Sequence, residues 1–376
     1  MTKKLFAVCV VGLLLSLAVT ALAHDEKSDT KPGEKVERSL AVDAEATVTL
    51  CVASGTLKVR GWEKSEIRVR SLDATQIDFR RIDKIKEKPP SRVDVMVLNK
   101  STSVNPKFDC QAVADVEMEV PANATVQVQT RDGDIIIAGV AGAYAGSQNG
   151  DIAIERATKL VEAGSVGGSI ILKDSSGRIN LSSAGGGVEA INIRAASEDD
   201  TFEVGTVSGD IQLDRVSNPK VTAKTVNGTV TMSGPLAKSG LYGLTNMTGD
   251  IVLAMPHDAS FQLNAKVSDK HVIVSDFNLK YLSDVTPPPP PVVKPRTPEA
   301  KGKGPEIKGK TPEVKGKTPP PTPQPAPKAG PVIAPIVVEK PMTTSYVLRR
   351  VSAIYGSGDA TISIASFGGT VRLKKI

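Results

Sequence analysis

A short unit of the form Gly-x-(Ile/Val)-x-(apolar) recurs along the chain and constrains its fold more than any other feature. The intervals between neighbouring copies, up to the one at Gly249, are 17, 18, 9, 9, 23, 19 and 21 residues, and most lie near 18 or half of it. A glycine at a corner allows a positive φ or a close approach between backbones, and the alternating apolar residues after it point to one side. One unit cannot bury that side alone, so successive units are expected to stack. The copies start at Gly133, Gly150, Gly168, Gly177, Gly186, Gly209, Gly228, Gly249 and Gly369.

Stacking of this kind predicts an all-β fold, a β-solenoid or β-helix-like strand repeat with about 18 residues and two strands in each turn. The composition agrees, because 7 Phe, 5 Tyr and 1 Trp are too few for an aromatic core, which leaves Val, Ile, Leu and Ala to fill it. A propeller is disfavoured, since its blades need repeats of about 40 residues or more. A β-sandwich is the alternative, because short strands at regular spacing are also typical of that fold.

The N-terminus has the three-part pattern of a secretory signal peptide, assigned to residues 1–23. Lys3 and Lys4 precede an apolar run from Leu5 to Leu22, and a small-residue cleavage site ends at Ala23. The alternative is an uncleaved membrane anchor, since the run is almost long enough to span a bilayer. Cleavage is favoured by the abrupt change to polar residues after Ala23. It predicts an exported protein that is periplasmic, cell-surface or secreted.

The mature chain keeps two cysteines, Cys51 and Cys110. In an oxidising compartment these two residues can form a disulfide, which on the chain-entropy model stabilises the fold by about 4 kcal/mol. Two buried thiols on separate strands are the equally weighted alternative.

Changes in composition divide the mature chain into segments. Residues 24–35 are polar and charged and are expected to be a disordered N-terminus. Period-2 alternation then predicts an N-terminal β-strand region over 36–120, in which 73–92 is a charged excursion with room for a short helix over 77–85. The solenoid repeats are expected over 121–285. Alternation returns in 342–376, which is expected to supply the final strands of the solenoid.

Residues 286–341 interrupt the repeats with a Pro/Lys-rich insertion. The segment contains 18 of the 26 prolines and has no apolar periodicity, so it is expected to be a disordered, extended surface loop. It also contains 10 Lys/Arg and 4 Glu, a net charge of +6 that equals the charge of the whole chain. The remainder is therefore neutral. An anionic envelope polymer, a membrane surface or a protein partner could bind this insertion, and a solubilising spacer is the alternative. No nucleic-acid partner is expected.

Several segments together resemble the bacterial putative-adhesin family of β-strand-repeat domains, whose function is unknown. These segments are Gly55–Trp62, Glu66–Arg70, Val120–Val126 and Thr130–Ile135 with the repeats that follow. The resemblance covers roughly 36–281 and the last repeat over 355–374. It implies an exported bacterial protein with a β-solenoid-like fold and supplies no catalytic residues.

Four repeat units carry an aspartate directly after the glycine. These pairs are Gly133 and Asp134, Gly150 and Asp151, Gly209 and Asp210, and Gly249 and Asp250. Stacking could align the carboxylates into a calcium- or sugar-binding ladder. The favoured interpretation is that each aspartate accepts hydrogen bonds from backbone N–H groups at the turn. The other copies hold Ser169, Arg178, Gly187, Thr229 and Thr370, and an arginine would repel a cation.

No catalytic, cofactor-binding or metal-binding residues are assigned. Residues 185–190 match a dinucleotide-binding fingerprint in form, but strand repeats lie on both sides where a βαβ unit is required. His24, His257 and His271 lack metal-ligand spacing. We therefore expect an exported, non-catalytic, adhesin-like protein that acts as a cell-envelope scaffold or binding surface. A polysaccharide-active right-handed β-helix enzyme is the alternative, and assembly through exposed end strands is a further possibility.

Overall fold

The computed structural model describes residues 35–83, 88–99, 110–268, 270–285 and 348–376. The expected signal peptide, nearly all of the 24–35 segment and the 286–341 insertion lie outside the described residues. Within the described part every regular element is a β-strand, and no helix there is long and apolar enough to cross a membrane. The chain forms two compact units, residues 1–175 and 176–376.

The first unit contains two sheets whose strands alternate along the chain. One has the order β1-β4-β7-β3-β9-β11-β13, and the other has the order β12-β10-β8-β2-β6-β5. The strands of the first sheet are β1 (Val36–Ala41), β3 (Leu57–Trp62), β4 (Glu66–Ser71), β7 (Val116–Pro121), β9 (Ile135–Ala138), β11 (Ile152–Glu155) and β13 (Ile170–Lys173). Those of the second are β2 (Thr47–Ser54), β5 (Gln76–Arg81), β6 (Arg92–Leu98), β8 (Thr125–Asp132), β10 (Gly142–Ser147) and β12 (Leu160–Ser165).

Apolar residues in register build the core between these sheets. Ile135, Ile152 and Ile170 occupy one position of the parallel strands β9, β11 and β13, and each is at most 1% exposed. Burying a side chain of this size contributes about 1.5–3 kcal/mol. Because alternate residues of a strand point to opposite faces, the period-2 pattern of the sequence places one aliphatic column inside and the polar residues outside. We call the two strands contributed by one repeat a rung.

The first unit begins with a mixed arrangement of strands. β4 runs antiparallel to both β1 and β7, and β5 runs antiparallel to β6. The expected short helix over 77–85 is wrong where the structure describes it, because Ile77 and Phe79 lie in β5 opposite Val97 and Val95. Ile77 is fully buried, so pairing with β6 decides the conformation of a segment whose own sequence is ambiguous.

The second unit is built in the same way. Its sheets have the orders β15-β17-β19-β21-β27-β23 and β24-β25-β22-β26-β20-β18-β16-β14. The first sheet contains β15 (Val188–Ile193), β17 (Ile211–Val216), β19 (Val230–Ser233), β21 (Ile251–Met255), β23 (Ile273–Ser275) and β27 (Val371–Lys375). The second contains β14 (Arg178–Ser183), β16 (Thr201–Thr206), β18 (Lys220–Asn227), β20 (Leu241–Thr248), β22 (Phe261–Ser268), β24 (Lys280–Val285), β25 (Leu348–Tyr355) and β26 (Ala360–Ser366).

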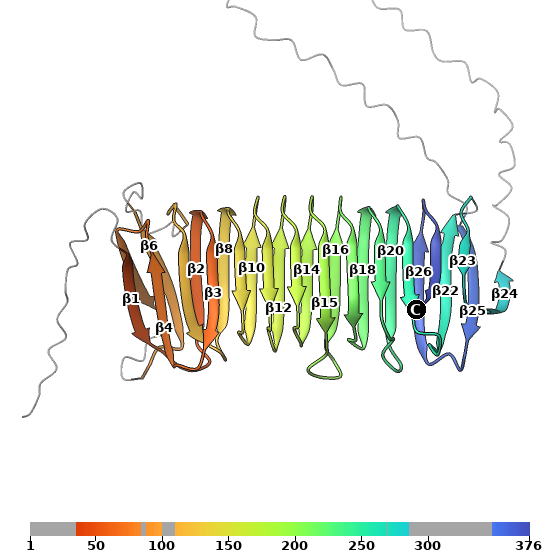
Figure 1. Ribbon diagram of the computed structural model, residues 1–376, viewed down its shortest axis with the longest axis horizontal. Coiled ribbons are helices and arrows are strands. Elements are labelled where there is room, and N and C mark those ends of the chain that lie inside the picture. Colours follow the sequence, from red (N-terminus) through yellow and green to blue (C-terminus); the bar gives the residue numbers. More distant parts are fainter. Residues whose placement is uncertain (1–34, 84–87, 100–109, 269, 286–347) are drawn as a thin grey trace, which may run out of the picture. The chain divides into compact units, whose positions relative to one another are not determined.

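The strands that follow the 286–341 insertion lie between strands that precede it. β26 pairs in parallel with β20 on one side and β22 on the other, and β27 lies in the same way between β21 and β23. Figure 1 shows β26 in blue between β20 and β22. The C-terminal residues therefore fill an internal rung of the second unit, and β22 and β23 lie beyond it.

The repeat copy at Gly177 is not equivalent to the others. Residues after it form β14, which pairs with β16, whereas the copies at Gly186 and Gly209 lead into β15 and β17 of the opposite sheet. The half-length interval of 9 residues therefore marks the passage between the two sheets within one turn. Arg178 therefore does not lie in the aspartate column and, contrary to the expectation from the sequence, would not repel a cation there.

Parallel pairing between successive rungs distinguishes this fold from a sandwich. β8, β10 and β12 pair in parallel in the first unit, as do β16, β18 and β20 in the second. Sandwich strands are mainly antiparallel, whereas a chain that coils through two sheets places equivalent strands side by side in the same direction. The prediction of an all-β, solenoid-like fold is confirmed.

Candidate functional site at the repeat edge

The repeat glycines stack directly on one another at the edge where the chain passes between the sheets. A Cβ atom on Gly150 would lie 1.8 Å from the carbonyl oxygen of Gly133, and one on Gly168 would lie 2.0 Å from that of Gly150. In the second unit, a Cβ on Gly249 would lie 2.3 Å from the oxygen of Gly228. Of the four repeat-turn glycines of the sequence analysis, Gly249 has a positive φ, 110°. Close approach between backbones is therefore the general reason for glycine here.

The repeat aspartates join each rung to the next. Asp134 Oδ1 accepts a hydrogen bond of 2.9 Å from the backbone N–H of Asp151, and Asp151 Oδ1 accepts one of 2.7 Å from that of Ser169. The second unit repeats the contact, with Asp210 accepting from Thr229 at 2.7 Å and Asp250 from Thr370 at 2.8 Å. Each carboxylate thus accepts a hydrogen bond from the following rung. The sequence had suggested a hydrogen bond from the same turn.

A column of buried hydroxyl groups, which sequence analysis missed, supports the same edge. Ser147 Oγ donates to the carbonyl of Gly133 at 3.1 Å and accepts from the N–H of Gly150 at 2.8 Å. Ser165 makes the equivalent pair of bonds one rung further on, at 3.0 and 2.9 Å. Both side chains are buried, so each hydroxyl satisfies two backbone groups that water cannot reach.

The signal for this column was present in the sequence. A Ser or Thr stands three residues before most repeat glycines, and Asn246 takes that place before Gly249. The members are Thr130, Ser147, Ser165, Ser183, Thr206, Thr225, Asn246 and Ser366. In the second unit Thr206 and Thr225 donate to the carbonyls of Gly186 and Gly209, each at 3.0 Å. The motif is therefore Ser/Thr-x-x-Gly followed in four copies by Asp, and its polar groups connect rungs.

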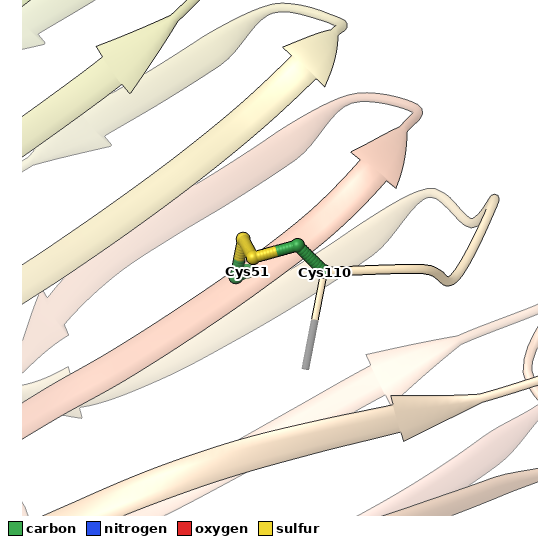
Figure 2. Close-up of a disulfide and its surroundings, with 2 residues drawn as sticks. All are labelled: Cys51 and Cys110. Carbon is green, nitrogen blue, oxygen red and sulfur yellow. A yellow bond between two sulfur atoms is a disulfide. The ribbon is translucent and has the colours of Figure 1, made fainter. Parts of the chain in front are cut away.

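Cys51 and Cys110 are joined by a disulfide in the first unit (Figure 2). Cys51 lies on β2, and Cys110 is an exposed residue before β7. Their Cα atoms are 4.8 Å apart, across 59 residues of sequence. The bridge ties the segment that enters β7 to a strand of the opposite sheet.

Among the titratable groups of the first unit, Asp132 stands near the repeat edge. The Arg131 guanidinium and then the Asn149 amide hold the pKa of the Asp132 carboxyl below its usual value, because both donate hydrogen bonds to its charged form. At Asp83, hydrogen bonds from Arg81 and from the Ser91 backbone lower the pKa in the same manner. In the second unit, burial raises the pKa of Tyr242, whose hydroxyl accepts a 2.6 Å hydrogen bond from the Ala237 N–H.

The other residues considered in the sequence analysis lie apart from one another. His257 follows β21 and His271 follows β22, while His24 is outside the described residues. Residues 185–190 lead into strand β15 and not into a helix, so the structural context of a dinucleotide site is missing there. Within the described ranges, no group of three or more His, Cys, Asp or Glu side chains is placed to hold a metal ion.

Comparison with solved structures finds distant similarities. The chain is similar to a putative adhesin from Parabacteroides merdae, with 10% identity and a TM-score of 0.37 over 60% of this chain and 90% of that one. It is also similar to a putative lipid binding protein from Parabacteroides distasonis, with 16% identity and a TM-score of 0.38 over 59% and 90%. It is similar as well to a putative cell adhesion protein from Clostridium sporogenes, with 9% identity and a TM-score of 0.23 over 91% of this chain and 100% of that one.

A search among curated proteins found no match. The family comparison is decisive, because the model of the Toastrack DUF4097 family matches residues 46–281, more than half of the chain. These residues contain Gly55–Trp62, Val120–Val126 and the repeats up to Gly249, on which the resemblance was based. The chain belongs to the Toastrack DUF4097 family, a domain family of unknown function.

Proposed function

We propose that the protein is an exported, non-catalytic, adhesin-like β-repeat protein that serves as a cell-envelope scaffold or binding surface. The observation that carries this proposal is the use of the recurring polar side chains. Asp151 and Ser165 each form a hydrogen bond to a neighbouring rung, as do Asp210 and Thr206. The most regular polar groups of the molecule thus hold the fold together, and the outward faces of the sheets are left as the surface for partners.

Export is supported by two features. Residues 1–23 have the pattern of a cleaved signal peptide, and the bridge between Cys51 and Cys110 is of a kind that persists in oxidising compartments. A periplasmic, cell-surface or secreted location follows from the proposal.

The 286–341 insertion is a candidate contact for an anionic envelope polymer, a membrane surface or a protein partner. Its net charge of +6 supports this part of the proposal. Deleting residues 287–340 should weaken binding to an anionic polymer or membrane. If binding is unchanged, the insertion is a spacer.

A glycan screen on the purified mature chain tests the proposal as a whole. The scaffold function predicts binding without cleavage, measured as constant reducing ends and constant absorbance of unsaturated sugar products over a long incubation. Enzyme-dependent release of either product would show that the polysaccharide-active β-helix enzyme is the correct function.

A further inference from the structure

One face of the second unit carries an excess of positive charge. On the sheet that contains β14, β16, β18, β20, β26, β22, β25 and β24, exposed lysine and arginine side chains are spread over several strands. These residues are Arg178, Lys220, Lys224, Lys266, Lys280, Arg349 and Arg350. Among the side chains that the structure describes on these strands, Glu203 is the single acidic one. The opposite sheet of the same unit has a smaller excess, because Glu189 and Asp214 accompany the basic residues Arg215, Arg372, Lys374 and Lys375.

Strand register brings three of these cations into one row across the sheet. Lys224 aligns with Thr245, Thr245 with Ala365, Ala365 with Lys266, and Lys266 with Arg350. Neighbouring strands are about 4.8 Å apart, so Lys266 and Arg350 are one spacing apart and Lys224 lies roughly 14 Å from Lys266. The row runs perpendicular to the strands.

A groove of about 410 Å³ lies on this face over β20, β26, β22 and β25, and Lys224 on β18 lies beyond its end. Its floor contains the small residues Gly243, Ser363 and Ala365, and the longer side chains of Lys266 and Arg350 line it. The depression has a simple cause, since β20 and β26 present small outward residues between strands that present long ones. A ligand that lies in the groove would contact both cations.

Polar groups in the groove complement the charges. The Ser352 hydroxyl donates to Asn264 Oδ1 at 3.2 Å, and both residues line the groove, where the amide of Asn264 also supplies an NH₂ donor. Thr245 and Ser363 add hydroxyl groups. This lining suits a ligand that carries both negative charge and many hydroxyl or carbonyl acceptors.

The salt bridges of the described residues do not include the cations of this groove. Neither Lys266 nor Arg350 has an acidic side chain within ion-pair distance among the described residues. A groove in the first unit differs in this respect, because its arginines form ion pairs. Arg38 pairs with Asp78 at 2.7 Å and Arg80 with Asp94 at 2.8 Å. Unpaired cations beside hydrogen-bonding groups are available to an anion from outside.

We propose that this groove binds an anionic polysaccharide that lies across the strands, with its carboxylates paired to Lys266, Arg350 and Lys224. The inference rests on the proposed binding-surface function and names the class of ligand. A membrane surface fits less well, because membrane docking uses a band of large apolar side chains. The exposed large apolar side chains on the strands of this sheet are Val226, Leu241, Met247, Tyr281 and Leu282, and none of them lines the groove. Single-stranded nucleic acid fits less well too, since its binding uses aromatic stacking platforms, and Tyr281 on the edge strand β24, the one exposed aromatic side chain described on these strands, does not line the groove.

The test compares two matched double variants of the full mature chain. K266Q/R350Q removes two charges from the groove, and R372Q/K374Q removes two from the opposite sheet. Binding is measured by calorimetry with polygalacturonate, with neutral dextran as the uncharged polymer, at two salt concentrations. K266Q/R350Q should weaken polygalacturonate binding about tenfold or more and reduce its salt dependence, since charge-assisted hydrogen bonds are lost. R372Q/K374Q should change affinity less than about twofold.

Several outcomes would overturn the inference. An equal loss of affinity for polygalacturonate in both double variants would mean that binding depends on net charge and not on the groove. If deleting residues 287–340 lowers this affinity and K266Q/R350Q does not, the binding site is the insertion. Selective loss of binding to phosphatidylglycerol vesicles or duplex DNA, with polygalacturonate unaffected, would identify another class of partner. Unchanged melting temperatures of both variants control for folding.

The same experiments distinguish failure of the proposed function from failure of the groove inference. Cleavage of polygalacturonate by the wild-type chain would overturn the non-catalytic function, and the groove would still be supported if K266Q/R350Q loses affinity. Binding without cleavage that is insensitive to K266Q/R350Q would overturn the groove and leave the scaffold function in place.

Discussion

Asp151 Oδ1 accepts a 2.7 Å hydrogen bond from the backbone N–H of Ser169, 18 residues further along the chain and one rung away. The same contact joins Asp210 to Thr229 in the second unit. A backbone donor at the sheet edge is thus satisfied by a side chain of the preceding rung. The column of aspartates is a way of connecting turns that have too few residues to form a separate core.

Removing this acceptor should weaken the fold modestly. Asp151→Ala is expected to lower the free energy of unfolding by about 1 kcal/mol, because the Ser169 N–H loses its partner at an exposed edge. Asp151→Asn keeps an acceptor oxygen and should lie closer to wild type. Urea denaturation measures both.

The double variant D151N/D210N tests the calcium ladder. Calcium should shift the melting temperature of this variant by the same amount as that of wild type. A calcium-dependent shift that is present in wild type and lost in the variant would support a metal-binding ladder.

A methyl group at the glycine column should be far more costly. Gly150→Ala would place a Cβ 1.8 Å from the Gly133 carbonyl oxygen, so the two rungs must separate, and we expect a loss of about 3 kcal/mol or more. Gly146→Ala is the matched control, because the nearest atom to its added Cβ is Gln129 Cγ at 3.7 Å.

The control should stay within about 1 kcal/mol of wild type. Chemical denaturation of the two variants provides the comparison. Equal stabilities of G150A and G146A would show that the rungs do not approach as closely as the structure has them.

The hydroxyl column gives a rescue experiment. Ser165→Ala should cost about 1–3 kcal/mol, because the buried Gly150 carbonyl and Gly168 N–H both lose a partner. Ser165→Thr should restore most of that stability, since Thr206 fills the equivalent position of another rung and makes the same donor contact. Amide hydrogen exchange at Gly168 offers a local readout. The Gly168 amide should exchange faster in S165A and not in S165T. An unchanged exchange rate of this amide in both variants would contradict its hydrogen bond to Ser165.

The disulfide should contribute a measurable share of the stability of the first unit. Replacing Cys51 and Cys110 together with alanine is expected to lower the free energy of unfolding by about 4 kcal/mol on the chain-entropy model. Reductant should destabilise wild type and leave the double variant unchanged. Mass spectrometry without reduction should show the mature chain two hydrogens lighter than the dithiol form, and alkylation of both cysteines in the native protein would contradict the bridge.

Sequence reasoning reached the architecture because the repeat has a strong physical cause. A glycine followed by alternating aliphatic residues specifies both the corner and the buried face, as Gly150 with Ile152 and Ile154 shows. It also identified the aspartates as backbone acceptors. It missed Ser147 and Ser165, because a hydroxyl inside a strand looks like an ordinary polar residue until the strand is placed at the edge of the core.

Errors arose where a short pattern has two structural meanings. The copy at Gly177 has the same spacing rule as its neighbours, yet it starts β14 in the opposite sheet. The apolar residues Phe79, Ile82 and Ile85 are three residues apart, as on one face of a helix, whereas pairing with β6 makes Gln76–Arg81 a strand. Local periodicity reports which face of a segment is apolar and carries no information about the partner that covers it.

By itself, the sequence determined the strand repeat, the family and the column of turn aspartates, because these follow from local spacing of residue types. The tertiary structure decided what depends on contacts between distant residues. It placed β26 between β20 and β22, turned each aspartate toward the next rung, and aligned Lys266 with Arg350 beside a groove. Register between strands far apart in sequence is set by how their side chains pack against one another, and a linear pattern does not contain that information.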